Sequence, residues 1–343
     1  MTDLEEFPRV VLGHWPTPFE PCHRLHEQVG GPLIWLKRDD CSGLALGGNK
    51  TRKLEFLLGE ATANGADGVV TFGAIQSNHA RQTAAACARV GLPCDLILVD
   101  MVARPTENYR ASGNRVLDDL LGATVHVVPD DETALATAAT LAEEQPDRYF
   151  IDPGGSSPVG ALGYVAAAEE LATQLADVAD ATPVATGVRP PLRFSSPAGP
   201  GSVVVASSTG GTAAGLIVGL ARVGIDTPVN AIAVHSDATH TATVIDQLVT
   251  TTAALVGIEP PSPERWSVDG SALGDGYGIE TEASHEALLT LARAEGVVLD
   301  PVYTAKAFAA LLGSLPTMDP DGDVVFLHTG GQAGVFAYAD AFS

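Results

Sequence analysis

The sequence predicts a two-domain α/β fold built on open, twisted parallel sheets. Short apolar runs rich in valine and isoleucine alternate along the chain with stretches of helical period, which is the order of βαβ units. Hydrophobic residues make up 45% of the chain and aromatic residues only 6%, so the core must be largely aliphatic, as in parallel sheets. A chain of 343 residues is also too long for one small core, which favours two lobes.

The first lobe follows from the pattern of residues 33–152. Strands are expected at β-branched or apolar runs, and helices where apolar residues recur every three or four positions. The expected strands are 33–36, 68–72, 95–99, 123–128 and 149–152. The expected helices are 52–63, 77–90 and 132–144.

A second series of elements begins near residue 159. The expected helices are 159–179, 212–221, 241–255 and a closing helix, and the expected strands are 203–206, 229–234 and 324–327. The proline-rich segment 182–201 lacks a hydrophobic period and is predicted to be a surface insertion. The restored alternation after it predicts a second sheet covered by helices.

The charge balance is strongly acidic, with a net charge of −23 and lysines only at positions 37, 50, 53 and 306. One explanation is a surface that mimics nucleic acid or binds cations. The other is a salt-rich cytoplasm, where charges are screened within about 3 Å at 1 M salt. We favour the salt-rich cytoplasm, and in either case the negative sign argues against nucleic acid or anionic lipid as a partner.

Nothing in the sequence predicts a membrane protein or a secreted one. No apolar run reaches the roughly 18 residues of a membrane span, and residues 1–9 carry acids where a signal peptide carries bases. The cysteines lack paired spacing, so free and mostly buried thiols are expected at Cys22, Cys41, Cys87 and Cys94. No His/Cys/Asp spacing resembles a metal centre. A cytoplasmic protein without a metal ion is therefore expected.

A glycine-rich turn at 43–48 leads through Asn49 to Lys50 near the expected start of a helix. A nucleotide P-loop is disfavoured because its lysine must follow the last glycine directly. The plainer alternative is a solvated helix start where Lys50, Arg52 and Lys53 cluster by chance, but positive charge there opposes the helix dipole. The same dipole disfavours the charged form of an amine, which favours a nucleophilic lysine suited to a Schiff base.

Two further motifs lie where an expected strand gives way to a helix, the place where α/β folds bind ligands. In Q-S-N-H-A-R-Q at 76–82, Ser77 suits the helix cap, and the free N–H groups after it could hold a substrate carboxylate. A plain cap with a polar helix face is the alternative there. In S-S-T-G-G-T at 207–212, the adjacent glycines depart from the dinucleotide pattern, and hydroxyls with N–H groups fit a single phosphate.

Five motifs in order carry a resemblance over nearly the whole chain: G-G-N-K-T-R-K-L-E at 47–55, Q-S-N-H-A-R-Q at 76–82, G-Y-G at 276–278, L-D-P-V-Y at 299–303 and H-T-G-G at 328–331. They resemble the D-cysteine desulfhydrase and 1-aminocyclopropane-1-carboxylate (ACC) deaminase family. The resemblance implies the tryptophan-synthase-β-like fold, pyridoxal 5'-phosphate as cofactor, a small amino-acid substrate and a homodimer. It also implies a large cofactor-binding domain of residues 1–52 and 162–343, with a small α/β domain of residues 53–161 inserted.

The resemblance further implies roles for single residues. For the cofactor, Lys50 binds it covalently beside Asn49, Asn78 hydrogen-bonds its phenolic oxygen, and its phosphate lies on Thr209, Gly210, Gly211 and Thr212. For the substrate, Ser77 holds the carboxylate, Asn78 and His79 lie beside it, and Tyr277 and Tyr303 serve as aromatic walls and proton donors or acceptors. His79 is interpreted as structural rather than catalytic. Without the family, both tyrosines would ordinarily be assigned to the core.

One position separates the substrate alternatives. In ACC deaminases, as the resemblance suggests, a glutamate near the pyridine nitrogen follows the second tyrosine, and this sequence has Thr304 there. A hydroxyl cannot keep the ring protonated as a carboxylate does, and thiol elimination can proceed with that weaker electron sink. We therefore expect elimination of D-cysteine to pyruvate, sulfide and ammonia, with Thr329 as the hydroxyl at the nitrogen. The alternatives are ACC deamination to 2-oxobutyrate and ammonia, an L-cysteate sulfo-lyase, and a protein that only binds the cofactor or an amino acid.

Overall fold

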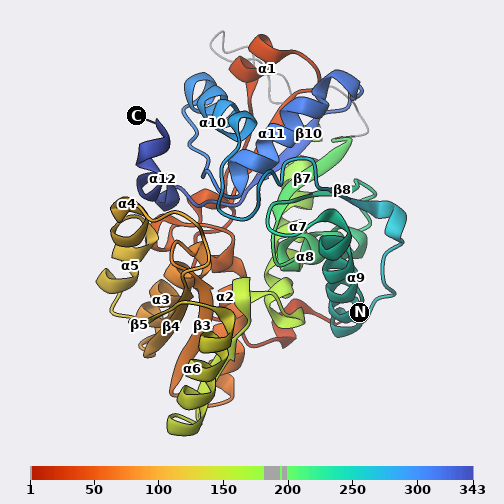
Figure 1. The fold of residues 1–343 in the computed structure, drawn as a ribbon. Helices are drawn as coiled ribbons and strands as arrows, with labels where there is room; N and C mark the ends of the chain where they lie inside the picture. The colour runs from red at the N-terminus through yellow and green to blue at the C-terminus, as the bar shows by residue number, and fades with distance from the viewer. Residues whose placement is uncertain (1, 181–193, 195–198, 343) are drawn as a thin grey trace.

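The strands form two sheets in the computed structural model, which describes residues 2–180, 194 and 199–342 (Figure 1). The larger sheet has the order β1-β2-β10-β7-β8-β9, with β1 antiparallel to β2 and the other neighbours parallel. Its strands are β1 (Phe19–Pro21), β2 (Ile34–Arg38), β7 (Ser202–Ser207), β8 (Val229–Ala233), β9 (Trp266–Asp269) and β10 (Val324–His328). The smaller sheet is parallel, in the order β5-β4-β3-β6, with β3 (Gly68–Ala74), β4 (Cys94–Val99), β5 (Thr124–Val128) and β6 (Arg148–Ile151).

Helices cover these sheets and join them (Figure 1). They are α1 (His23–Val29), α2 (Lys50–Ala63), α3 (Asn78–Val90), α4 (Glu107–Ala111), α5 (Asn114–Leu120), α6 (Asp131–Glu144), α7 (Pro158–Asp180), α8 (Gly211–Arg222), α9 (Ala238–Val256), α10 (Glu282–Glu295), α11 (Thr304–Ser314) and α12 (Ala333–Ala337). Helix α2 packs against α3 on one side and α7 on the other, and α7 packs against α8. The α2–α7 contact therefore connects the two sheets. No helix in the described ranges is long and apolar enough to span a membrane.

The strands and helices predicted from the sequence are present, with ends shifted by a few residues. The predicted free thiols are confirmed, and only Cys41 is exposed. Strands β1 and β9 were not predicted, because they are very short and lie at the edges of the large sheet, where exposure weakens the hydrophobic pattern. Helices α1, α4, α5, α10 and α11 were also not predicted. For α10 the start signal is unusual, since its capping box pairs Thr281 with Ser284 instead of the usual Glu or Gln.

The centre of the large sheet is buried on both faces. Val203 and Val205 of β7 point into a core formed with α7, α8 and α9, whereas Val204 points into the opposite core with α10 and α11. This two-sided burial explains why 203–206 reads as a continuous apolar run without alternation. Most of the predicted insertion 182–201 lies outside the described residues. Phe194, which is described, is buried and its ring lies 5.0 Å from that of Trp35.

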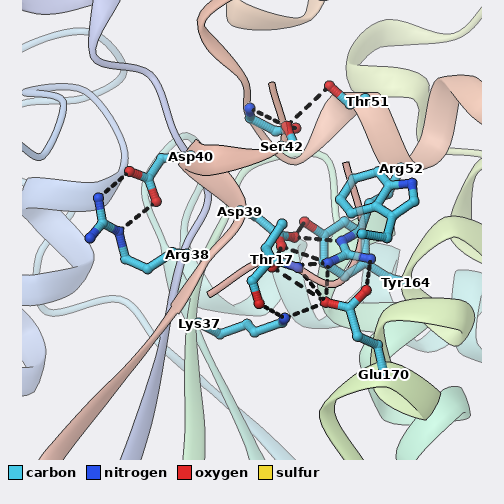
Figure 2. A network of polar contacts seen from close by, with 12 residues as sticks. Thr17, Lys37, Arg38, Asp39, Asp40, Ser42, Thr51, Arg52, Tyr164 and Glu170 are labelled. Atoms are coloured by element: carbon cyan, nitrogen blue, oxygen red, sulfur yellow. Dashed lines mark hydrogen bonds and ion pairs between the residues drawn. The ribbon is translucent and has the colours of Figure 1, made fainter. Parts of the chain in front are cut away.

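A buried ionic network joins α2 to α7 and to the segment after β2 (Figure 2). The guanidinium of Arg52 donates to both carboxylate oxygens of Asp39, at 2.8 and 2.9 Å, and to both of Glu170, at 2.9 and 3.0 Å. Lys37 also pairs with Glu170, and Tyr164 donates to Asp39 at 2.5 Å. Although burial opposes it, the charge of Arg52 holds the pKa of Asp39 below its usual value. The sequence motif around Lys50 thus contains one cation that serves the fold.

Candidate active site

Lys50 is the first residue of α2, at the helix end that carries the positive partial charge. Its Nζ donates a hydrogen bond to Oδ1 of Asn49 at 2.9 Å. Burial lowers the pKa of Lys50 to about 8, with Asp300 acting in the opposite direction and Arg81 adding to the decrease. A large fraction of the amine is therefore neutral near pH 8, as nucleophilic attack requires.

The loop before Lys50 is held from behind by α3. Nη1 of Arg81 donates to the carbonyl oxygens of Ala45 at 2.5 Å and Gly47 at 2.8 Å. Gly47 has a φ of +67°, and a Cβ there would lie 2.1 Å from the carbonyl oxygen of Asp40. The glycine is therefore required by both backbone conformation and space.

The start of α8 forms a cradle for an anion. Gly210 has a φ of +77°, and a Cβ on Gly211 would lie 2.7 Å from Oγ of Ser156 and 2.9 Å from Nζ of Lys53. Lys53 is buried, and its Nζ donates to the carbonyl of Gly154 at 3.0 Å and to Ser156 at 3.1 Å. Burial and the nearby charge of Lys50 lower the pKa of Lys53 well below its usual value. A phosphate on the helix N–H groups would supply the anion that this ammonium needs.

Asn49 joins three segments around this cradle. Its Nδ2 donates to Oγ1 of Thr212 at 2.9 Å, and its backbone N–H donates to the carbonyl of Thr329 at 2.9 Å. One cavity is lined by all the residues predicted to bind the cofactor: Asn49, Lys50, Asn78, Thr209, Gly210, Gly211, Thr212 and Thr329. The structure therefore brings these separate motifs together.

An adjoining and more open cavity contains the residues predicted for the substrate. These are Ser77, Asn78, His79, Tyr277 and Tyr303, with Lys50 between the two cavities. Ser77 caps α3, because its Oγ accepts the backbone N–H of Ala80 at 3.1 Å. The first N–H groups of a helix have no carbonyl partner within it, so the start of α3 offers donors to a carboxylate.

His79 makes a hydrogen bond that determines which of its ring nitrogens carries the proton. Its Nε2 lies 2.8 Å from Oγ1 of Thr71, whose own hydrogen goes to the carbonyl of Ile151 at 2.8 Å. Nε2 must then carry the ring proton. Burial, together with Lys50 and Lys53, lowers the pKa of His79 well below its usual value. This neutral, tethered ring fits the structural role predicted from the sequence.

Tyr277 and Tyr303 lie side by side in the lining of the open cavity. Their hydroxyl groups hydrogen-bond, and their ring centroids are 5.8 Å apart. Burial raises the pKa of Tyr277 to about 12 and that of Tyr303 well above its usual value, so both stay neutral donors. Lys306 donates to the carbonyls of Leu273 at 2.7 Å and Gly276 at 2.8 Å, which fixes the loop that carries Tyr277.

Thr304 has a different environment from Thr329. Its Oγ1 donates to Oδ1 of Asp300 at 2.6 Å, and it does not line either cavity, whereas Thr329 lines the cavity with Lys50. The carboxylate of Asp300 also accepts the backbone N–H groups of Val302 and Tyr303, each at 3.0 Å. Asp300 therefore organises the turn that places Tyr303.

Sequence reasoning missed the roles of Lys53, Arg81, Asp300 and Lys306. The sequence carried one indication of these roles, which is that the chain has only four lysines. The structure shows that three of them are almost completely buried: Lys37, Lys53 and Lys306. A lysine kept inside an acidic protein must have a partner there. Which partner it has depends on segments far apart in the chain.

A family model for pyridoxal-phosphate dependent enzymes matches residues 10–330. The chain belongs to this family. D-cysteine desulfhydrases of Salmonella choleraesuis strain SC-B67 and Salmonella paratyphi C strain RKS4594 are 40% and 39% identical to it over 341 residues, covering 98% of this chain and 97% of each relative. The predicted family, enzyme class and cofactor are thereby confirmed.

Two solved structures show the same fold. The crystal structure of an ACC deaminase homologue has a TM-score of 0.83 and 34% identity, and covers 98% of this chain and 96% of its own. The crystal structure of a threonine deaminase from T.th. has a TM-score of 0.65 and 20% identity, with 92% of both chains covered. The predicted α/β fold of this enzyme class is confirmed by both.

The residues present fit pyridoxal phosphate. Lys50 offers a partly neutral amine, the start of α8 at Gly210 and Gly211 borders the inner cavity without a Cβ, and the buried amine of Lys53 lines the same cavity. In the described part of the chain, no carboxylate forms an ion pair with Lys53. A phosphate is the group that satisfies both the cradle and this lysine.

Replacing Lys53 by glutamine is expected to raise the dissociation constant of the cofactor by about 10- to 150-fold, since a hydrogen bond to a charged group contributes roughly 1.5–3 kcal/mol. The measurement is a titration of the apoprotein with pyridoxal phosphate, followed by absorbance. Arg89→Gln, at an exposed position on α3, serves as the control. An unchanged constant for Lys53→Gln would remove this lysine from the phosphate site.

Proposed function

We propose that this enzyme eliminates D-cysteine to pyruvate, sulfide and ammonia, with one water consumed. The relatives described above support this proposal as far as the family of reactions. The choice of D-cysteine as the substrate depends on which residues line the two cavities.

The observation that carries the proposal is the lack of a carboxylate among the residues that line the inner cavity with Lys50, in the described chain. A ring nitrogen in this cavity has the hydroxyl of Thr329 available and no acidic partner. The ring is then a weaker electron sink than one kept protonated by a carboxylate. A substrate with a good leaving group at its β-carbon, such as a thiol, tolerates that sink better than the ring of ACC.

The outer cavity argues against L-cysteate. Its lining on the side of the small sheet is mostly apolar, formed by Phe72, Val99, Met101, Ala134 and Leu135, and it includes the acidic residue Asp131. Within the described residues, no arginine lines either cavity. A sulfonate would be desolvated there without a cation reserved for it, whereas a thiol is tolerated by apolar surface.

The residues have distinct tasks in this reaction. When bound, pyridoxal phosphate withdraws electron density from Cα of the substrate, so that its proton can be removed. Lys50, with its lowered pKa, accepts that proton. Ser77 and the start of α3 bind the carboxylate, and the hydroxyl pair of Tyr277 and Tyr303 supplies a proton to the departing sulfur.

The test is steady-state release of sulfide, pyruvate and ammonia from D-cysteine, L-cysteine, L-cysteate and ACC at multimolar KCl. Sulfide with pyruvate from D-cysteine alone is the expected result. Release of 2-oxobutyrate from ACC would instead make ring opening the function and overturn the argument from Thr329 and Thr304. Bleaching of the visible cofactor band by D-cysteine without sulfide would indicate binding alone.

We also propose the domain division 1–52 with 162–343, and 53–161, and a homodimer. The strands before and after the proposed inserted domain share the large sheet, and β3–β6 form the small one.

The proposed homodimer is supported by large apolar side chains that are exposed on two helices that pack together. These are Leu120 and Val116 on α5 and Phe336 on α12. Exposed apolar side chains on neighbouring helices suit contact with a second copy of the chain. Light scattering on the unmodified protein and on Leu120→Asp tests this association.

A salt-rich working environment is proposed from the charge, and it predicts that the melting temperature rises between 0.1 and 2 M KCl. The surface carries an excess of carboxylates, and lysine contributes little to balancing them because its four copies are used inside the protein or at the site. Salt screens this repulsion. Calorimetry in KCl and in a neutral osmolyte of equal osmolality separates two effects. KCl screens the repulsion between carboxylates, whereas the neutral osmolyte acts only through its exclusion from the protein surface. A flat or falling melting temperature in KCl would contradict the proposal.

A further inference from the structure

Asn114, the first residue of α5, has its side chain fully buried against α3. Its Oδ1 accepts a hydrogen bond from Nε of Arg81 at 3.0 Å, and its Nδ2 donates to the backbone carbonyl of Gln76 at 3.0 Å. A guanidinium only donates and a carbonyl only accepts. These two partners therefore fix the direction of the Asn114 amide.

The same Nδ2 of Asn114 also donates to Oδ1 of Asn78, at 2.8 Å. Asn78 must then turn its oxygen towards Asn114 and its NH₂ group away from it. The Nδ2 of Asn78 would lie 2.9 Å from a Cβ on Gly331, and Asn78 lines both cavities with Lys50. Arg81 thus fixes the orientation of the Asn114 amide, and Asn114 in turn fixes the orientation of the Asn78 amide.

The backbone around Asn114 is anchored as well. Its N–H donates to Oε1 of Gln76 at 2.9 Å, and Nε2 of Gln76 donates to the carbonyls of Tyr109 at 2.6 Å and Ser112 at 2.9 Å. The preceding Gly113 has a φ of +60°, and a Cβ there would lie 2.6 Å from Oε1 of Gln76. The amide of Asn114 consequently has little freedom to follow a change in Asn78.

We propose that Asn114 is a positioning residue that fixes the amide of Asn78, so that Asn78 presents an N–H donor to the phenolic oxygen of the cofactor. This inference rests on the proposed function and on the hydrogen bond from Asn78 to that oxygen that the family resemblance implies. A donor at this oxygen favours its anionic form and so sets the pH at which the visible band of the bound cofactor changes. Asn114 acts on that equilibrium without touching the cofactor.

The test compares Asn114→Asp with Asn114→Leu. The carboxylate of the first variant keeps the hydrogen bond with Arg81 but can only accept, so Asn78 must turn its Nδ2 towards it and its oxygen towards the cofactor. The apparent pKa of the visible band should rise by about one to two units, the size expected for losing a hydrogen bond to a charged group. Leucine imposes no direction on the amide of Asn78. The rise in the apparent pKa of the visible band should therefore be less than half as large in Asn114→Leu as in Asn114→Asp.

Two controls accompany the comparison. Asn108→Asp, an exposed position in the same segment, should leave the band unchanged. The unfolding midpoint of each apoprotein is measured in parallel, and leucine should destabilise at least as much as aspartate because only aspartate keeps the hydrogen bond with Arg81. Equal band shifts for both variants, or a larger shift for leucine, would overturn the inference and leave a purely structural role. If the unmodified protein forms no visible band with pyridoxal phosphate, the proposed function fails instead.

Discussion

The Lys50→Ala protein is expected to lose at least about 10³-fold in the rate of pyruvate formation from D-cysteine while keeping its fold. The substitution removes the nucleophile that binds the cofactor and the base that accepts the Cα proton, and a positioned base alone contributes roughly 10²–10⁴-fold. Among the described residues, the substitution removes a single side-chain hydrogen bond, to Oδ1 of Asn49. The measurements are the steady-state rate and the visible absorbance that survives gel filtration.

Lys50→Arg is the matched variant, since it keeps a cation but not a nucleophile, and it should be equally inactive. Near-normal rates in either variant would move the covalent role to another lysine, Lys53 being the nearest in sequence. The unmodified apoprotein provides a second check. Because the pKa of Lys50 is lowered to about 8, the neutral amine accumulates as pH rises through 8, so cofactor capture should accelerate there and level off above it. A lysine with its ordinary pKa of 10.5 would still be accelerating at pH 10.

Replacing Arg52 by methionine is expected to lower the free energy of unfolding by about 3–5 kcal/mol, because removing one partner of a buried ion pair leaves the other charge uncompensated. Arg52 donates to two carboxylates, those of Asp39 and Glu170, and the side chain of Asp39 is fully buried. Its guanidinium also lies 4.0 Å from the ring of Trp15. Denaturant unfolding of the apoprotein gives the free energy directly.

Arg110→Met is the control for the Arg52 experiment. Arg110 pairs with Asp100 at an exposed position, so its loss should cost only about 0.2–1 kcal/mol. Equal effects of the two substitutions would mean that the network of Arg52 contributes no more than a surface pair. A loss of activity without loss of stability in Arg52→Met would indicate a role in placing Lys50 instead.

The motifs were readable from the sequence because each is local. Lys50 follows its glycine turn within a few residues, Ser77 caps the helix it begins, and the glycines at 210 and 211 precede α8 directly. Turn and cap chemistry depends on neighbouring backbone atoms, so spacing alone predicts it. The alternation of strands and helices likewise follows from local hydrophobic period.

The sequence by itself therefore determined the fold class, the family with its cofactor, and the set of residues that meet around Lys50. Tertiary structure alone decided the surroundings of those residues: Arg52 pairs with Asp39, Lys53 donates to Ser156, Thr304 donates to Asp300, and Asn114 donates to Asn78. The physical reason is that burial and hydrogen-bond polarity depend on partners from distant segments. Local sequence pattern carries no information about which of these partners will meet.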